Sequence, residues 1–253
     1  PEASFIKHWL QAISMARKSS SCTKASKVIF PNDKGDNLEG ILHKGKSGKL
    51  IIACHGYNSS KEGPAVSRLS EELNRKGFSV LRFDFTGHGN SEGKNSNDAL
   101  QWVLDIGFAI RKFNRQFRKI IIVGTSFSGF VSAISAARYT GISGLVTVNG
   151  LFNLKRTTFK LLLRKPSMLF SRKSVSNMVL YKRDFRPEDI KVPALVIHGS
   201  ADIVVEPEQS RRFYSMLRTE KRLDILEGAD HFLSGDKDVE SAAKSIAEWA
   251  GRI

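Results

Sequence analysis

Residues 120–139 of the chain have the sequence IIIVGTSFSGFVSAISAARY. The β-branched start is typical of a buried strand, and the Ala-rich end is typical of a helix. Between them lies GTSFSG at 124–129, where a sharp turn lifts the hydroxyl of Ser126 off the sheet edge, beside the first N–H groups of the helix. The usual pattern of such a turn is G-x-S-x-G, and this chain has Ser128 at the second glycine and Gly129 one place later. The segment predicts an exposed nucleophilic serine between a strand and a helix.

Short apolar runs alternate with helix-like stretches along the rest of the chain. The first two are short extended runs, and those from residue 50 onward are rich in Val, Ile and Leu and continuous rather than alternating, as in strands that are covered on both faces. The runs span residues 27–30, 38–43, 50–54, 80–84, 120–123, 145–148, 194–197 and 223–226. Helical spacing of apolar residues is found in 64–76, 97–117, 127–139, 208–217 and 239–249. This alternation predicts an α/β fold with a mostly parallel central sheet covered by helices on both faces.

The composition is that of a globular protein. The chain has 253 residues, 41% of them hydrophobic, which suffices for a large core without a disulfide or a structural metal. Collagen-like, disulfide-rich and disordered proteins are therefore excluded. The two cysteines, Cys22 and Cys54, lie in unlike surroundings and are not expected to pair, which fits a reducing compartment.

Residues 1–26 precede the core and are basic, Ser-rich and amphipathic. We expect an N-terminal extension that forms a surface helix, because the segment lacks the apolar centre of a signal peptide. No apolar stretch of the chain approaches the ~18–20 residues of a membrane span. We therefore expect a cytoplasmic protein, and organelle targeting by the extension stays open.

Polar residues follow the expected strands at the places where catalytic groups collect in α/β sheets. Asp202 comes shortly after the run at 194–197, and His231 comes after the last run, at 223–226. Together with Ser126 they occur in the order Ser, Asp, His, which is the order of the α/β-hydrolase triad. We expect Ser126 to be the nucleophile, His231 the general base and Asp202 the acid that orients the imidazole.

The run at 50–54 continues into HGYN, residues 55–58. A glycine at position 56 lets this backbone come close to the serine turn. The N–H of Tyr57 is therefore a candidate oxyanion donor, paired with the N–H of Phe127 at the start of the helix.

Other polar residues in these loops have a structural interpretation. His55 lies directly after a strand and is expected to make structural hydrogen bonds, and Asp84 and His88 are expected to hold their glycine-rich loop. Asp230 is a weaker partner for His231, because adjacent residues generally point apart. The six histidines show no metal-ligand spacing, and we expect neither a metal nor an organic cofactor.

With these motifs the chain resembles the serine α/β-hydrolase superfamily. It looks most similar to the small-lid esterase group of cinnamoyl esterases, monoacylglycerol-lipase-like enzymes and the hydrolase half of hydrolase–OsmC fusions. The motifs that carry the resemblance are HGYNSSK (55–61), LRFDFTGHGNSEG (81–93), GTSFSG (124–129), HGSADIVV (198–205) and GADHFLSG (228–235). The resemblance implies the triad of Ser126, Asp202 and His231. It also implies Tyr57 and Phe127 as the oxyanion donors, in agreement with the positions of these residues after the expected strands.

The resemblance also implies a division of the chain into a core and a lid. The α/β-hydrolase core comprises 27–149 and 192–253, and a short helical lid at 150–191 is inserted before the penultimate strand. The lid segment carries 11 basic and 3 acidic side chains, more than half of the net charge of +15. These cations either face water above an acyl pocket or dock weakly on an anionic membrane surface. A nucleic-acid partner is not expected, because no recognition motif accompanies the charge.

The expected function is that of a serine hydrolase that cleaves a small-molecule carboxylic ester through an acyl-enzyme intermediate. The alternatives are a lipase, a thioesterase or a peptidase acting on another acyl substrate, since the triad does not distinguish these bonds. A further alternative is a non-catalytic α/β-hydrolase fold used for binding. The sequence gives no indication of the oligomeric state.

Overall fold

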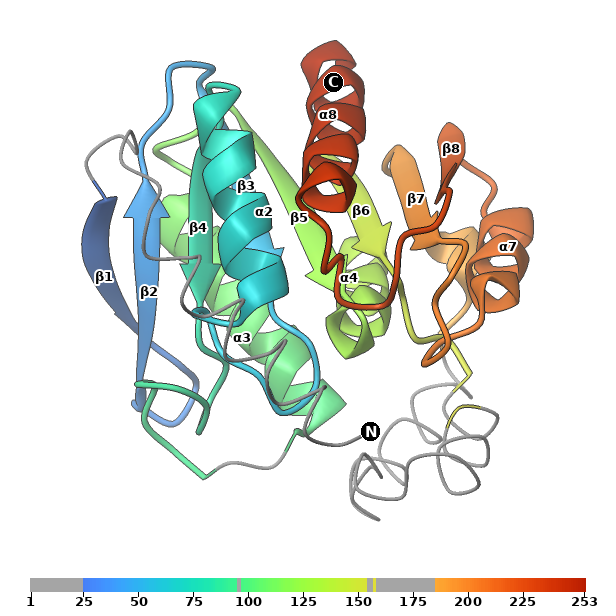
Figure 1. Ribbon diagram of the computed structural model, residues 1–253. Coiled ribbons are helices and arrows are strands. Elements are labelled where there is room, and N and C mark those ends of the chain that lie inside the picture. The colour runs from blue at the N-terminus through green and yellow to red at the C-terminus, as the bar shows by residue number, and fades with distance from the viewer. Residues whose placement is uncertain (1–24, 95–96, 154–156, 158–184) are drawn as a thin grey trace, which may run out of the picture.

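The computed structural model describes residues 25–94, 97–153, 157 and 185–253, and these form an eight-stranded sheet with helices on both faces (Figure 1). The strands lie side by side in the order β1-β2-β4-β3-β5-β6-β7-β8. Their bounds are β1 Ala25–Pro31, β2 Asn37–His43, β3 Lys49–Cys54, β4 Ser79–Phe83, β5 Lys119–Thr125, β6 Gly144–Val148, β7 Ala194–Gly199 and β8 Lys221–Leu226. β1 and β2 pair antiparallel, as do β2 and β4, and the pairings from β4 through β8 are parallel. The α/β-hydrolase fold predicted from the sequence is confirmed.

The described helices divide between the two faces of the sheet. In Figure 1, α2 (Pro64–Arg75) and α8 (Asp236–Arg252) lie in front of it, and they contact each other. The opposite face carries α3 (Ala99–Phe113) and α4 (Phe127–Arg138). The short α7 (Pro207–Met216) packs into the same cluster as α3 and α4.

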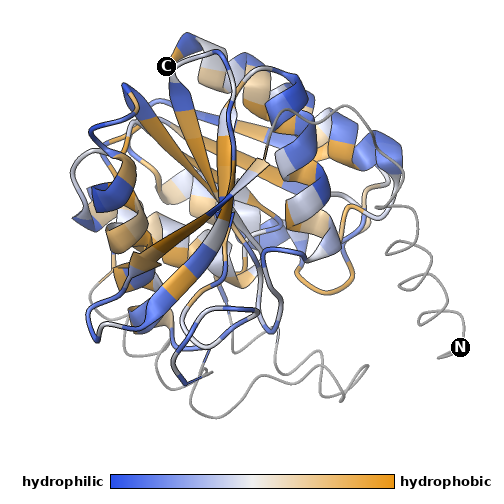
Figure 2. Cartoon of the chain, turned by 90° about the vertical axis from the view of Figure 1, so that its left-hand side faces the viewer, coloured by the Kyte–Doolittle hydropathy of each residue, from blue (hydrophilic) through white to orange (hydrophobic). Residues whose placement is uncertain are grey.

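The central strands explain why their apolar runs are continuous. Along β5, Ile120 and Ile122 face the cluster beneath α3 and α4, whereas Ile121 and Val123 face the cluster beneath α2 and α8. All four side chains are buried because both faces of the strand are covered. Figure 2 shows the result as hydrophobic strands through the middle of the molecule with helices on either side.

The chain order of the strands determines where the site lies. The segment after β3 passes through α2 to β4 on one side, and the segment after β4 returns through α3 to β5 on the other side of β3. In open α/β sheets, ligands bind outside the carboxyl ends of the strands, at such a reversal of order. The loops that follow β3 and β5 should therefore frame the site.

Element bounds agree closely with the sequence predictions, with one notable difference in α3. The helix predicted over 97–117 begins at Ala99, because the side chain of Asp98 caps it by accepting a hydrogen bond from Leu100 N–H. It ends at Phe113, and the next residues turn so that Arg118 N–H donates to Gly48 O where β5 begins.

Two predicted segments lie largely outside the described residues. Of the extension at 1–26, residues 1–24 are not described, and β1 begins at Ala25. Of the lid at 150–191, only 150–153, 157 and 185–191 are described, and they include the 3-10 helix η3 (Pro187–Asp189). In the part of the chain that the structure describes, no helix is both long and apolar enough to span a bilayer.

Candidate active site

Ser126 occupies a strained turn between β5 and α4. Its φ of 55° and ψ of −119° are values that side chains rarely adopt and that cost about 1–3 kcal/mol. Backbone hydrogen bonds hold the turn: Ser126 N–H donates to Val148 O at 2.9 Å, and Ser126 O accepts from Gly129 and Leu151 N–H, both at 3.0 Å. The structure thus has the sharp strand-to-helix turn at Ser126 that the sequence predicted.

The serine at position 128 fits the place where a glycine was expected. Its Oγ accepts a hydrogen bond from Thr125 N–H at 2.8 Å and lies 2.8 Å from Cys54 O, to which it donates. The side chain of Ser128 is fully buried. The glycine one place later is the position that a side chain would disturb, because a Cβ on Gly129 would lie 2.9 Å from the Cα of Gly150.

His231 links Ser126 to Asp202. Its Nε2 lies 3.0 Å from the Oγ of Ser126, and its Nδ1 lies 2.6 Å from the Oδ2 of Asp202. A carboxylate accepts only, so Nδ1 carries the proton that it donates to Asp202, and Nε2 accepts from the serine hydroxyl. The structure thus brings together the three residues that the sequence selected from loops far apart in the chain.

Asp202 is buried and accepts several hydrogen bonds. Its Oδ1 accepts from the N–H groups of Val204 at 2.9 Å and Val205 at 2.8 Å. Burial raises the pKa of Asp202, but the hydrogen bonds from His198 and His231 outweigh it and lower this pKa to about 2. The carboxylate therefore stays ionised at neutral pH.

His198 is a partner of Asp202 that the sequence analysis missed. Its Nε2 lies 2.9 Å from Val205 O and 3.2 Å from the Oδ2 of Asp202, and its Nδ1 lies 2.6 Å from the Oγ of Ser210. The side chain is fully buried in β7. The available signal was its place within the motif HGSAD, where His198 and Asp202 fall in one strand-to-loop segment.

The two predicted oxyanion donors lie on segments that meet at Ser126. A Cβ built on Gly56 would lie 3.3 Å from the Cβ of Ser126, so the backbone before Tyr57 passes directly against the turn. Phe127 is the first residue of α4, and its N–H is one of those that find no acceptor within a helix. The rings of Tyr57 and Phe127 pack edge to face with centroids 5.9 Å apart.

Comparison with known proteins shows the family of the chain. The family described as serine aminopeptidase, S33 (Hydrolase_4) matches residues 45–188 and 184–238. The chain belongs to this family. It is a serine α/β-hydrolase by family and by fold.

The individual relatives share only low sequence identity with this chain. The hydrolase is 26% identical over 221 residues to the uncharacterized protein YfhR of Escherichia coli (strain K12), covering 82% of this chain and 73% of YfhR. It is 28% identical over 116 residues to the proline iminopeptidase PfmaB of Pestalotiopsis fici, covering 44% of this chain and 40% of PfmaB. The structure of the Pyrococcus furiosus esterase Pf2001 superposes with a TM-score of 0.75 at 20% identity, covering 91% of each chain. That likeness shows the fold.

The other polar residues of the hydrolase's loops make hydrogen bonds within the fold. His55 is buried, its Nε2 accepts from Phe85 N–H at 3.3 Å, and burial lowers its pKa to about 4. Asp84 accepts from Asn90 N–H at 2.9 Å inside the glycine-rich loop. Asp230 accepts hydrogen bonds from the backbone of its own turn and does not face the imidazole of its neighbour.

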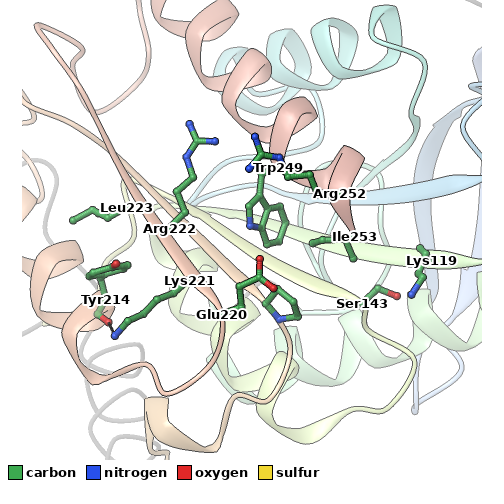
Figure 3. A pocket seen from close by; sticks show the side chains of 11 residues that line it. Lys119, Ser143, Tyr214, Glu220, Lys221, Arg222, Leu223, Trp249, Arg252 and Ile253 are labelled. Atoms are coloured by element: carbon green, nitrogen blue, oxygen red, sulfur yellow. Dashed lines mark hydrogen bonds between the residues drawn. The ribbon is translucent and has the colours of Figure 1, made fainter.

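A depression of about 740 Å³ lies at the amino ends of the hydrolase's parallel strands and is open to solvent (Figure 3). Its lining includes Lys119 and Lys221, the first residues of β5 and β8, together with Trp249 and Arg252 near the end of α8. This is the amino edge of the parallel strands, opposite to Ser126. The depression is therefore separate from the candidate active site.

Proposed function

We propose that this hydrolase cleaves carboxylic esters through an acyl-enzyme, with Ser126 as nucleophile, His231 as general base and Asp202 as the orienting acid. The observation that carries the proposal is the chain of contacts from Ser126 Oγ to His231 Nε2 at 3.0 Å and from His231 Nδ1 to Asp202 at 2.6 Å. These are the separations that proton transfer between a nucleophile and its base requires.

The first half of the reaction forms the acyl-enzyme. Ser126 Oγ attacks the ester carbonyl carbon as its proton passes to Nε2 of His231. The N–H groups of Tyr57 and Phe127 stabilise the oxyanion, and loss of one such donor typically costs ~10²–10³ in rate. The tetrahedral intermediate then collapses, the C–O bond to the alcohol breaks, and the imidazolium returns the proton to the leaving oxygen.

The second half hydrolyses the acyl-enzyme. His231 takes a proton from water as the water oxygen attacks the acyl carbon, and Ser126 leaves with that proton. Asp202 holds the imidazole in the required tautomer and stabilises the imidazolium in both halves. Its low pKa of about 2 keeps it anionic throughout the cycle.

The test is hydrolysis of p-nitrophenyl esters from short to long acyl chains by the wild type and by Ser126→Ala. We expect turnover to fall by ~10⁴–10⁶-fold in a folded variant. The matched control is Ser135→Ala, which removes a buried hydroxyl from the same helix and should retain activity. A folded Ser126→Ala protein with near-normal turnover would refute the assignment.

A peptidase is the second candidate, favoured by the description of the family and by the match to a proline iminopeptidase. The same nucleophile and base serve amide cleavage, with an amine leaving in place of an alcohol. Prolyl p-nitroanilide, assayed beside the esters, separates the two. Higher kcat/KM on the anilide than on any ester would replace the ester proposal with the peptidase.

A further inference from the structure

The loop that carries Tyr57 is held by the segment that follows β4. We refer to residues 55–61, HGYNSSK, as the 55–61 loop. At its start, Phe85 N–H donates to Nε2 of His55 at 3.3 Å. Directly after Tyr57, Asn58 has a φ of 50°, and its N–H donates to Oδ1 of Asn97 at 3.0 Å.

The strongest anchor is a buried ion pair at the end of the 55–61 loop. Nζ of Lys61 lies 2.5 Å from Oδ2 of Asp84, and the N–H of Lys61 donates to Oδ1 of the same carboxylate at 2.6 Å. The side chains are 3% and 0% exposed, so water does not screen the pair. A second carboxylate, Glu39 on β2, lies 3.0 Å from the same Nζ.

The surroundings of Lys61 favour its charged form. Burial lowers the pKa of Lys61, but the carboxylates of Asp84 and Glu39 outweigh it and raise this pKa. The loop after β4 is shaped to admit the carboxylate. Gly89 has a φ of +49°, and a Cβ there would lie 2.1 Å from Oδ2 of Asp84.

A buried ion pair is a poor way to gain stability. Desolvation of two charges offsets most of their attraction, and apolar side chains of similar size often serve as well. A buried pair does, however, select one geometry, because an unpaired charge in the interior is strongly disfavoured. The bidentate contact of Asp84 with the N–H and Nζ of Lys61 therefore fixes the backbone of the 55–61 loop.

We propose that Lys61 and Asp84 are positioning residues that set the oxyanion donor Tyr57 against Ser126. The inference rests on the proposed function, since it concerns the same site. Gly56 packs tightly on Ser126, since a Cβ there would lie 3.3 Å from the Cβ of Ser126, so a small displacement of the 55–61 loop moves the Tyr57 N–H relative to the reacting carbonyl. Misplaced donors lower the rate of the chemical step rather than substrate affinity.

The test replaces the ion pair by neutral side chains. Lys61→Met alone leaves the Asp84 charge buried and unpaired and should lower the urea midpoint of unfolding markedly. The double variant Lys61→Met/Asp84→Asn removes both charges and should recover most of that midpoint. Its kcat on p-nitrophenyl esters should nevertheless stay ~10–100-fold below wild type with KM nearly unchanged, a part of the loss expected for a missing oxyanion donor.

A second readout is the rate at which a fluorophosphonate labels the protein. In this reaction Ser126 Oγ bonds to phosphorus, the P–F bond breaks, fluoride leaves, and the serine proton passes to His231. The labelling uses the same oxyanion donors but needs no particular ester. It should slow in the double variant in parallel with kcat.

The matched control is Arg222→Met/Asp224→Asn, which neutralises an ion pair of 2.8 Å on β8. Its rates should equal those of the wild type. If the double variant at Lys61 does not fold, Glu39→Gln supplies the measurement, because it removes one carboxylate from Lys61 and should give a smaller loss in both rates. Wild-type rates in a folded variant, or an equal loss in the control, would overturn the inference.

The outcomes separate this inference from the proposed function. A wild-type protein that labels at Ser126 but hydrolyses no ester removes the ester proposal, and the labelling rates of the variants still decide the role of Lys61. A wild-type protein that neither labels nor hydrolyses overturns both. Active wild type with an unaffected double variant overturns the positioning role alone.

Discussion

Asp84 and Asp202 are both buried aspartates at the carboxyl edge of the sheet, but they face different partners. Asp84 follows β4 and binds the ammonium group of Lys61 at 2.5 Å, whereas Asp202 follows β7 and binds the imidazole of His231 at 2.6 Å. An ammonium keeps its proton at neutral pH, and an imidazole gains and loses one. In our proposals the partner therefore decides the role of the carboxylate. Beside a lysine, Asp84 anchors backbone, and beside a histidine, Asp202 takes part in a proton-transfer chain.

The largest expected effect comes from neutralising the carboxylate beside the imidazole. Asp202→Asn should lower kcat by ~10⁴-fold, because the amide favours the wrong imidazole tautomer and leaves the imidazolium unpaired. Asp224→Asn, the same change within β8, should leave kcat unaffected. Steady-state kinetics on both variants checks this. A folded Asp202→Asn enzyme whose kcat lies within tenfold of the wild-type value would contradict the distinction drawn between Asp84 and Asp202.

A third buried aspartate extends the comparison to a carboxylate that no cation of the described residues pairs with. Asp105 on α3 accepts from Thr86 N–H at 2.8 Å and Thr86 Oγ1 at 2.9 Å, and burial raises its pKa to about 6. The folded protein therefore binds a proton here more tightly than the unfolded chain, so the contribution of Asp105 to stability is present below pH ~4 and is lost as pH rises to ~6. The shift corresponds to about 3 kcal/mol.

Urea unfolding of the wild type and Asp105→Asn between pH 4 and pH 8 measures this term. The free energy of unfolding of the wild type, relative to the variant, should fall as pH rises through that window. If the difference in free energy of unfolding between wild type and variant stays constant with pH, the pKa of Asp105 is not raised by folding. The environment would then separate Asp105 less from Asp84 and Asp202 than their different partners suggest.

The smallest of these effects is the acid sensitivity that comes from Asp202. Its pKa falls from 3.8 to about 2 on folding, so it stabilises the protein above pH ~4 and this contribution is lost as pH falls from ~4 toward ~2. The shift corresponds to about 2 kcal/mol. Acid unfolding followed by circular dichroism should show a shallower loss for Asp202→Asn than for the wild type. Identical acid profiles would contradict the depressed pKa.

Much of the fold could be predicted from the order and character of the local segments. The eight strands and the five described helices were expected within a few residues, because apolar runs, caps and glycines act over short distances. The positions of Ser126, Asp202 and His231 followed from the same logic, since each comes shortly after a strand and parallel strands end at one edge. Their catalytic roles stay a prediction.

Other features depend on which segments meet in space. The sequence does not say that β4 lies outside β3, that His198 reaches Asp202, or that Lys61 pairs with Asp84. It also does not say that Ser128 fits between Thr125 and Cys54, where a glycine is usual. The energies of buried polar groups depend on partners that are distant in the chain and on the exclusion of water, and both arise only when the sheet and its helices close around them.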